Sequence, residues 1–406
     1  MAKIFVFTAR QSIDRRKFVL PIIPFKPGEE ADICAGRLWI FDNEIAGIQG
    51  DLLPGGIVDV YDVHKSFLGR GYCNMRSKIR VRLLTRQHEN IDKEFFIKRL
   101  KQAISLRIRL GHSNACRMIF GDADLLPGLT VDRFGEVLVL QIATLGMEQF
   151  KECITECLKE LLHPQCIYER SDLPARKKEG LEMRTGVLFG KEPGLVEIRE
   201  NGLRILIDVV HGQKTGYFLD QRENRAAIAP FAQGDVLDCF CHTGGFALHA
   251  AKYGASSVEA VDVSASALQM VQMNAELNQF NMIKPIEANV FDLLKNYEQA
   301  NKKFDLVILD PPAFAKSRSA LRGAERGYKE INLRGMELVK PGGFLVTCSC
   351  SRFMTPKLFL DMIKRASADV GRAARILEIR YQSKDHPMLL GAEESLYLKC
   401  VILQIF

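Results

Sequence analysis

The stretch at 235–246, DVLDCFCHTGGF, has the residue types and spacing of a cofactor-binding turn. A short apolar strand leads into Thr243, Gly244 and Gly245, where the two glycines let backbone approach a ligand closely; a helix is expected over 246–253. Strand, glycine turn and helix form the first unit of a doubly wound sheet, which binds its ligand beyond the carboxyl ends of the strands. We therefore expect Asp238, Thr243, Gly244 and Gly245 to bind a cofactor.

The next predicted strand, SSVEAVDV at 256–263, carries Asp262 near its end. In nucleoside-binding sheets, a carboxylate at about this distance from the glycine turn takes a ribose diol. The turn lacks the GxGxxG pattern that grips a pyrophosphate, so a nucleoside without pyrophosphate suits it better. These features predict S-adenosylmethionine as the cofactor.

Two further predicted strands end in side chains that can do chemistry. FDLVILD at 304–310 runs into Asp310 and two prolines, and FLVTCSCS ends in Cys348 and Cys350, which are two positions apart and share a strand face. A cysteine in a strand is ordinarily a small buried hydrophobic residue, and an aspartate before prolines is ordinarily a turn cap. Whether these cysteines and Asp310 take part in a reaction therefore depends on the residues around them.

Length and composition describe a globular protein of two or three domains, with 406 residues, 47% of them hydrophobic and 26% charged. No apolar run is long enough to span a bilayer, and the first residues lack the pattern of a signal peptide, so we expect a cytoplasmic protein. The net charge of +7 permits a nucleic-acid partner without requiring one.

The eleven cysteines stand at irregular spacings, several of them inside apparent strands and helices. This distribution indicates reduced thiols rather than a disulfide framework. Cys239 and Cys241 have no matching pair of cysteines or histidines, so we expect no metal site.

Residues 1–90 have the pattern of a small β-rich domain, with short strands between turn residues. In the segment MRSKIRVRLL, cations alternate with apolar residues, and a period of two places them on one strand face. Such a face suits an RNA phosphate backbone, and an edge strand kept soluble by charge is the equally weighted alternative. The cations are Arg76, Lys78, Arg80 and Arg82.

Residues 91–194 form a predicted α+β module. Apolar residues recur at helical spacing over 91–111, the segment 129–142 has the pattern of a hairpin, and 147–162 that of an amphipathic helix. No catalytic constellation stands out there. Residues 195–406, which contain the glycine turn, are expected to form the third domain.

The segment GQKTGYFLDQRENR follows a predicted hairpin that turns at Asn201 and Gly202. Its aromatic residues can stack on an adenine, and its polar residues can bind the amino-acid end of the cofactor. On charge pattern alone, helix capping is the favoured role of Arg222 and Arg225. The expected cofactor contacts are Tyr217, Phe218, Asp220, Gln221 and Arg222.

Nearly the whole chain resembles the RlmI-type family of ribosomal RNA large-subunit methyltransferases, which methylate carbon 5 of a cytosine in 23S rRNA. Residues 1–90 resemble its PUA domain, GDADLLPGLTVDRFG its central domain, and GQKTGYFLDQRENR, DCFCHTGGF, DPPAF and SCS its methyltransferase motifs. The resemblance implies a Rossmann-like class I methyltransferase domain behind a PUA-like β-barrel and a central α+β domain. It also implies 23S rRNA or an assembling subunit as partner, and homodimers.

The resemblance assigns roles to single residues. Enzymes of this kind add a thiolate to carbon 6 of the base, and Cys350, within SCS, matches the family nucleophile, while Cys348 is expected to be packing. Asp310 is expected to contact the cofactor and to hydrogen-bond the base, and Phe314 to stack on the flipped base. Asn289 stands where such enzymes usually have an acidic residue for the adenine amino group, and its oxygen can still accept.

Two other functions fit parts of the same sequence. The DPPAF loop resembles the loop of amino-group methyltransferases, which need no cysteine, although Ala313 separates the prolines from the aromatic residue. Activity that survives Cys350→Ala would favour that chemistry. A non-catalytic RNA-binding protein is the third interpretation, and failure to bind S-adenosylmethionine would favour it. His386 is expected in a loop near the active end, as a proton carrier or a loop stabiliser.

Overall fold

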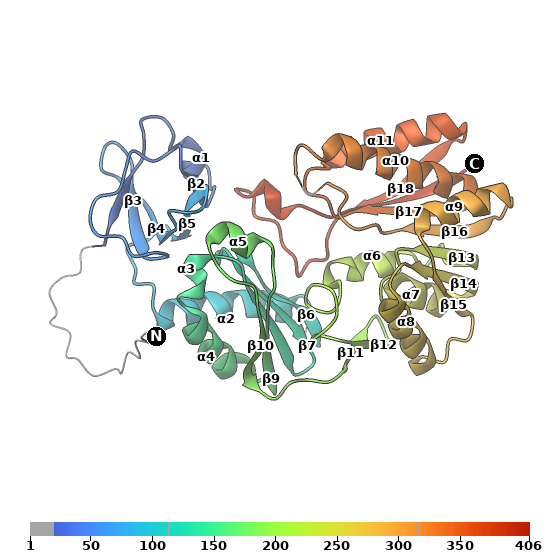
Figure 1. Ribbon diagram of the computed structural model, residues 1–406, viewed down its shortest axis with the longest axis horizontal. Coiled ribbons are helices and arrows are strands. Elements are labelled where there is room, and N and C mark those ends of the chain that lie inside the picture. Colours follow the sequence, from blue (N-terminus) through green and yellow to red (C-terminus); the bar gives the residue numbers. More distant parts are fainter. Residues whose placement is uncertain (1–19, 113, 316) are drawn as a thin grey trace, which may run out of the picture.

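The computed structural model describes residues 20–112, 114–315 and 317–406. It shows three parts that follow one another along the chain, coloured blue, green, and yellow to red in Figure 1. Within the described residues, no helix combines the length and the apolar character needed to cross a membrane.

The first part is a five-stranded sheet in the order β1-β3-β4-β5-β2. It encloses a small apolar core that includes Ile23, Ile40 and Val58, all without exposed surface. The predicted strand at 75–84 begins only at Ile79, because Asn74 to Ser77 form a turn. The strands are β1 (Ile22–Pro24), β2 (Trp39–Phe41), β3 (Ile57–Tyr61), β4 (Phe67–Cys73) and β5 (Ile79–Thr85), with the short helix α1 (Ala31–Cys34).

The second part is a five-stranded sheet in the order β10-β9-β8-β7-β6, against which helices α2 and α4 pack. The predicted hairpin at 129–142 is present as β7 and β8. The helix expected over 147–162 is divided at Gln149 and Phe150, where Phe150 leaves helical geometry with a φ of −103° and a ψ of 7°, and Gly146 in the first of the two helices lies against the ring of Tyr72. The elements are α2 (Lys93–Arg109), β6 (Ala115–Phe120), η1 (Gly121–Asp124), β7 (Leu129–Phe134), β8 (Val137–Ile142), α3 (Leu145–Glu148), α4 (Lys151–Leu162), β9 (Cys166–Ser171), α5 (Ala175–Glu179) and β10 (Arg184–Gly190).

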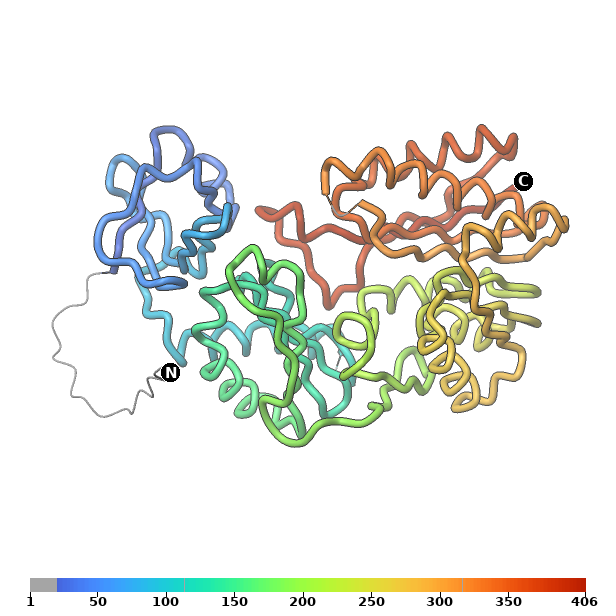
Figure 2. The backbone as a smooth tube through the Cα atoms, viewed as in Figure 1, coloured from blue at the N-terminus to red at the C-terminus, as the bar shows by residue number. Residues whose placement is uncertain are grey.

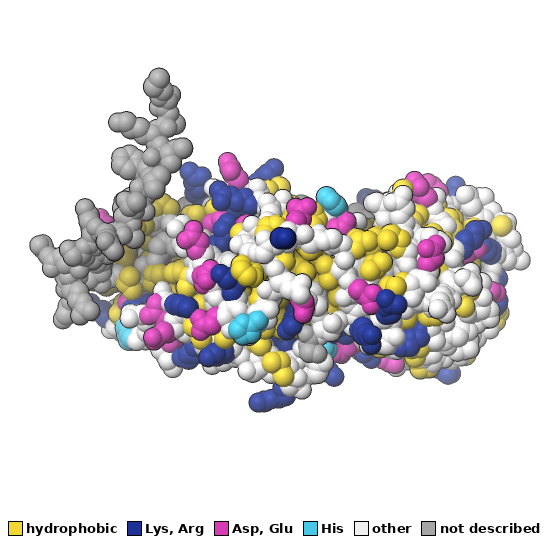
Figure 3. All heavy atoms as spheres, turned by 90° about the horizontal axis from the view of Figure 1, so that it is seen from below, with side chains coloured by type: hydrophobic (Ala, Val, Ile, Leu, Met, Phe, Trp, Pro, Cys, Tyr) yellow, Lys and Arg dark blue, Asp and Glu magenta, His cyan; other side chains and the backbone are white. Residues whose placement is uncertain are grey.

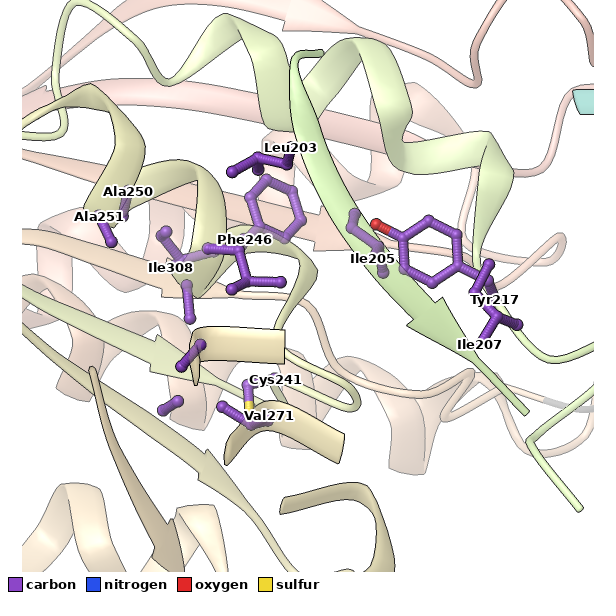
Figure 4. Packing of buried hydrophobic residues seen from close by; sticks show 14 of the residues in the cluster. Leu203, Ile205, Ile207, Tyr217, Cys241, Phe246, Ala250, Ala251, Val271 and Ile308 are labelled. Carbon is purple, nitrogen blue, oxygen red and sulfur yellow. The ribbon is translucent and has the colours of Figure 1, made fainter. Parts of the chain in front are cut away.

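A hairpin of β11 (Val196–Glu200) and β12 (Leu203–Ile207) connects this sheet to the third part. Its turn residues, Asn201 and Gly202, have φ angles of 49° and 80°, as the predicted two-residue turn requires. Figure 4 shows Leu203 next to the Phe246 ring and Ile205 next to the Tyr217 ring, within one buried cluster. The hairpin is followed by η2 (Leu219–Gln221) and α6 (Arg222–Ala227).

The third part is a seven-stranded sheet in the order β15-β14-β13-β16-β17-β19-β18. The pairs from β15 to β17 are parallel, and β19 runs antiparallel to both of its neighbours. The buried runs that the sequence predicted as strands are the central strands. The strands are β13 (Gly234–Cys239), β14 (Ala255–Asp262), β15 (Ile283–Glu287), β16 (Phe304–Leu309), β17 (Val339–Ser349), β18 (Ala374–Arg380) and β19 (Lys399–Ile405).

Helices cover both faces of this sheet, as a doubly wound fold requires (Figure 1). Helices α7 (Gly245–Tyr253) and α8 (Ala265–Leu277) pack on one face together with the hairpin. Helices α9 (Val290–Gln299), α10 (Leu321–Leu338) and α11 (Pro356–Val370) contact one another on the other face.

The segment 381–398 is a loop, which we call the bridging loop, and the closing strand β19 follows it. It leaves the third part and reaches toward the first two, as the red segment in Figure 2 shows. It contains η3 (Glu393–Ser395). Asp385 accepts a hydrogen bond from the backbone N–H of Arg117 at 2.9 Å, and the backbone of Gly391 lies directly against that of Gly36. The loop therefore contacts all three parts.

The buried carboxylate of Glu200, at the end of β11, holds the segment that follows the hairpin. Arg225 donates to it twice, at 2.7 and 2.9 Å, and the hydroxyl of Tyr217 donates at 3.0 Å. Glu200 and Arg225 are 2% and 3% exposed, so neither charge has water as an alternative partner.

We predict that Glu200→Ala destabilises the protein by ~3–5 kcal/mol, because it leaves the Arg225 guanidinium buried without its partner. Glu197→Ala, on the same strand, is the matched control: its ion pair with Arg204 is exposed and contributes at most about 1 kcal/mol. Urea unfolding followed by circular dichroism measures both changes. Equal losses in the two variants would contradict the role of burial.

Candidate active site

A cavity of about 190 Å³ lies beyond the carboxyl ends of β13, β14 and β16, where a doubly wound sheet binds its ligand. Segments that are distant in the sequence form its walls. Just under half of its lining was predicted, namely Tyr217, Phe218, Asp220, Gln221, Thr243, Gly245, Asp262, Asp310 and Cys350. The remaining lining residues are Gln213, Lys214, Arg225, Phe240, Cys241, His242, Phe246, Val263, Pro311, Pro312 and Leu398.

The turn after β13 forms the floor of this cavity. Asp238 is fully buried, and its Oδ2 accepts from the backbone N–H of Ala247 at 2.9 Å, in the first turn of α7. Gly244 has a φ of 84°, and a side chain there would press on Val271 of α8. Neither residue lines the cavity: contrary to the expected direct contact, Asp238 and Gly244 give the turn its shape.

Asp262 reaches the cavity from the end of β14. Its Oδ2 accepts from the backbone N–H of His242 at 2.9 Å, and its Oδ1 accepts from that of Ser264 at 3.0 Å. A carboxylate fixed in this way keeps lone pairs for two further donors. The arrangement suits the two hydroxyls of a ribose, as the sequence predicted.

Asp220 and Gln221 form the opposite wall. Asp220 is buried; its Oδ2 accepts from the Tyr397 hydroxyl at 2.5 Å, while its Oδ1 has no partner among the described residues. Gln221 donates from Nε2 to Asp310 Oδ1 at 2.9 Å. A buried carboxylate oxygen that faces a cavity without a donor fits a cationic ligand group.

These walls match the parts of S-adenosylmethionine. The free oxygen of Asp220 suits its ammonium group, Asp262 suits the ribose, and Phe246 and Val263 add apolar surface for the adenine. The residues present therefore fit the cofactor that the sequence predicted.

Asp310 directly follows β16 and stands between the two walls. Burial, and then the negative charge of Asp220, raise the pKa of its carboxyl to about 7. The hydrogen bond from Gln221 acts in the opposite direction. Near neutral pH, Asp310 therefore exists in both forms and can either donate or accept a proton.

Two cysteines line the cavity, Cys241 and Cys350, and burial raises the pKa of the Cys241 thiol well above its ordinary value. Cys350 lies one residue past the end of β17, with its sulfur 3.8 Å from the carbonyl oxygen of Pro311. Burial raises the pKa of its thiol to about 11, while the positive charge of Lys214 lowers it. Cys348 is fully buried inside the sheet opposite Cys400, and burial raises the pKa of its thiol well above the usual range. The thiol just past the end of β17, that of Cys350, is therefore reachable from the cavity, whereas the thiol inside the strand, that of Cys348, lies in the core.

Two lysines near Cys350 were not predicted from the sequence. Lys214 places its ammonium 4.4 Å from the centre of the Phe218 ring, at the cavity. Lys399 is 2% exposed and donates to the carbonyls of Ser351 and Tyr397 at 2.7 and 2.9 Å. Burial lowers its pKa to about 8, and the charge of Cys350 acts in the opposite direction. In the sequence, the position of Lys399 at the start of the apolar run KCVILQI could have indicated that this lysine is buried.

Arg222 does not bind in the cavity, contrary to its expected cofactor contact. Its guanidinium lies 2.6 Å from Nδ1 of His112 and donates to the carbonyl of Ala115, on the central sheet. It is therefore committed to holding two parts of the chain together. Arg225 lines the cavity, but its charge is paired with Glu200.

Asn289 and Phe314 are also placed differently from their predicted roles. Asn289 is exposed, and its side-chain oxygen accepts from the backbone N–H of Phe291 at 2.9 Å, as the cap of α9. The Phe314 ring packs 4.6 Å from the ring of Tyr328, centre to centre. Neither residue lines the cavity.

The four cations predicted to bind RNA do not share one strand face. Arg82 is buried and pairs with Glu179 of the second part at 3.0 Å, and Arg80 donates to the carbonyl of Met75. Arg76 and Lys78 are exposed but precede the strand. On the face seen in Figure 3, basic side chains are interspersed with acidic ones.

His386, in the bridging loop, stabilises that loop. It is 2% exposed, and its Nδ1 lies 2.9 Å from Oδ1 of Asp385. Its ring centre is 5.3 Å from that of Phe120, and it does not line the cavity.

Two family models match the chain. A model described as an S-adenosylmethionine-dependent methyltransferase matches residues 183–383, and a PUA-like domain model matches residues 23–86. The first match contains the glycine turn, Asp310 and Cys350. The second contains β2 to β5.

The full chain is also similar to named proteins. It is 43% identical over 387 residues to the ribosomal RNA large subunit methyltransferase I of Aeromonas hydrophila, covering 93% of this chain and 97% of the relative. It is 42% identical over 393 residues to the protein of the same name from Shewanella amazonensis, covering 95% and 99%. A solved structure from Streptococcus mutans, described as a SAM-dependent methyltransferase, shares the fold with a TM-score of 0.81 at 22% identity, covering 94% and 99%.

We predict that Asp310→Asn stabilises the protein more at pH 8 than at pH 5. The folded pKa of about 7 lies above the ordinary value of 3.8, so ionising Asp310 costs folding free energy as pH rises through this interval, and asparagine avoids this cost. We expect a gain of at least about 1 kcal/mol at pH 8, since one pKa unit corresponds to about 1.4 kcal/mol. Unfolding curves at both pH values measure it.

The control for this prediction is Asp361→Asn, an exposed position on α11, which should show no such pH-dependent gain. A stability difference for Asp310→Asn that is the same at pH 5 and pH 8 would contradict a raised pKa.

We predict that Lys214→Met and Lys399→Met each slow the alkylation of Cys350 at pH 8. Both ammonium groups lower the pKa of this thiol, so their loss reduces the thiolate fraction, roughly tenfold for each pKa unit. Mass spectrometry of the modified peptides after iodoacetamide treatment gives the rate. The exposed Cys34 serves as the reference in the same sample, and an unchanged ratio of the two rates would exclude the effect.

Proposed function

The chain belongs to the ribosomal RNA large subunit methyltransferase I family, and from this premise we propose that it methylates carbon 5 of a cytosine in 23S rRNA. As a member of the family it is an S-adenosylmethionine-dependent rRNA methyltransferase. When bound, S-adenosylmethionine supplies a methyl group on an electrophilic sulfonium. The observation that supports the base and the position is that Cys350 and Asp310 face one cavity.

Carbon 5 of cytosine is a poor nucleophile, and Cys350 is placed to activate it. The thiol loses its proton to solvent, and the thiolate forms a bond to carbon 6 of the base. The electron pair of the double bond moves to carbon 5, which then takes the methyl group. Solvent water then takes the proton from carbon 5, the electron pair of that bond restores the double bond between carbons 5 and 6, and the bond from carbon 6 to sulfur breaks, so that Cys350 leaves as the thiolate.

Asp310 is placed to assist this addition. When the thiolate adds, negative charge reaches the ring nitrogen next to the amino group, and the protonated carboxyl of Asp310 can donate to that nitrogen. It takes the proton back when the thiol leaves. Its pKa of about 7 suits both directions near neutral pH.

Lys214 and Lys399 favour the attacking form of Cys350. The thiol is buried enough to stay protonated near neutral pH, and the two ammonium groups oppose this effect of burial. Lys399 contacts this segment through its hydrogen bond to the backbone carbonyl of Ser351. We therefore regard it as a positioning residue rather than a catalytic one.

Methylation of an amino group by the DPPAF loop is less well supported. In such enzymes, the aromatic residue of the loop faces the base, whereas Phe314 packs against Tyr328 away from the cavity. The reachable thiol of Cys350 would also have no role in that chemistry.

The partner and the site of action follow from the proposed substrate. We propose 23S rRNA, free or within an assembling large subunit, and hence a cytoplasmic place of action. The homodimer implied by the family resemblance stays a prediction.

We predict that Cys350→Ala lowers the formation of 5-methylcytidine by roughly a thousandfold or more, because the other cysteine of the cavity lining, Cys241, is 6% exposed and burial raises the pKa of its thiol well above the ordinary value. Cys348→Ala is the matched control and should stay within a few-fold of the wild type, since that thiol is in the core. The assay uses undermodified 23S rRNA and labelled S-adenosylmethionine, with the product identified by mass spectrometry. A methylated purine, or an active Cys350→Ala, would overturn the proposed chemistry.

A further inference from the structure

A second cavity, of about 350 Å³, lies between the three parts of the protein. We call it the Trp39 cavity, after the single tryptophan of the chain. Its other lining residues come from the central sheet, from the turn after Cys350 and from the bridging loop. They are Phe120, Gly121, Asp122, Ala123, Gly128, Thr130, Gln141, Ala143, Leu173, Arg352, Glu394, Ser395 and Tyr397.

The Trp39 indole is held in a fixed orientation while part of its surface stays accessible. Its Nε1 donates to Oδ1 of Asp122 at 2.7 Å, across the boundary between the first two parts, and its ring remains half-buried. The guanidinium of the exposed Arg352 lies 5.6 Å from the centre of this ring, and it has no hydrogen bond or ion pair to a described residue. An oriented aromatic ring beside an uncommitted guanidinium is a stacking surface.

The Trp39 cavity is adjacent to the active site. Tyr397 lines it and donates from its hydroxyl to Asp220 in the wall of the active site, and the next residue, Leu398, lines the active site itself. Arg352 follows Cys350 by two residues, at most roughly 7 Å of chain. A nucleotide next to a flipped cytidine can therefore reach it.

The charges in this cavity favour a base over a phosphate. Asp122 and Glu394 are acidic, and burial raises the pKa of Asp122. Carboxylates repel a phosphate but accept hydrogen bonds from the amino groups of bases. The one cation, Arg352, stands over the aromatic ring.

We propose that the Trp39 cavity binds a nucleobase of the substrate RNA that flanks the methylated cytidine, stacked on the Trp39 indole, and that the exposed Arg352 side chain moves outward to place its guanidinium against the outer face of the base. This subsite rests on the proposed rRNA methyltransferase function. It holds the strand in place while the target base occupies the active site.

Because Trp39 is the only tryptophan, protein fluorescence tests its contact with RNA directly. The probe is a short 23S rRNA fragment that contains the methylated cytidine. We expect this fragment to quench the fluorescence at saturation, and S-adenosylmethionine alone to leave it unchanged. Unchanged fluorescence with bound RNA, shown by anisotropy of a labelled fragment, would overturn the stacking.

Kinetics of the full-length variants provide the second test. Trp39→Ala and Arg352→Ala should each raise KM for the fragment roughly tenfold, with kcat and S-adenosylmethionine affinity nearly unchanged, since stacking of one base contributes about 1–3 kcal/mol. Lys65→Ala, at an exposed cation of the same N-terminal part for which no RNA contact is expected, is the control and should change KM little.

The outcomes distinguish this subsite from the reaction itself. A wild type that forms no 5-methylcytidine contradicts the proposed function. A wild type that forms it, while both Trp39→Ala and Arg352→Ala keep their KM, contradicts the subsite alone. Arg352 is exposed, so its variant remains informative if Trp39→Ala fails to fold.

Discussion

One buried carboxylate, that of Glu200, determines where the cofactor wall stands. A charge without access to water must be paired, and Glu200 finds its partners in Arg225 and Tyr217, on the segment that follows its own hairpin. This pairing fixes η2 against the sheet, and with it Asp220 and Gln221, which face the cavity. The active site therefore depends on an ion pair that binds neither substrate nor cofactor.

Burial in the cavity has opposite consequences for the two side chains that we propose to react, Cys350 and Asp310. Burial keeps the Cys350 thiol protonated, which is unfavourable for a nucleophile, and it keeps a large share of Asp310 protonated near neutral pH, which is favourable for an acid. The sheet brings both groups to one edge, and the lysines offset burial mainly at the thiol. Position within one cavity thus gives two side chains different chemistry.

The sequence predicted those features that depend on local pattern. The ends of β13, β14, β16 and β17 were recognisable from apolar runs and the residues that follow them, and the hairpin turn from its Asn-Gly pair. The sequence did not predict features that depend on partners distant along the chain. Arg82 alternates like a surface cation but meets Glu179, and Phe314 follows the prolines but meets Tyr328. The contacts of Lys399 and Trp39 form only when separate parts of the chain pack together.

The bridging loop has a consequence for the biosynthesis of the protein. Asp385 accepts hydrogen bonds from Arg107 of α2 and from Arg117 of β6, which precede it by 278 and 268 positions. Because a chain is made from its N-terminus, the first two parts are complete long before this loop leaves the ribosome. Their contacts with the third part are therefore completed only after residues 381–398 have been made, so a nascent chain that lacks them cannot yet close the Trp39 cavity.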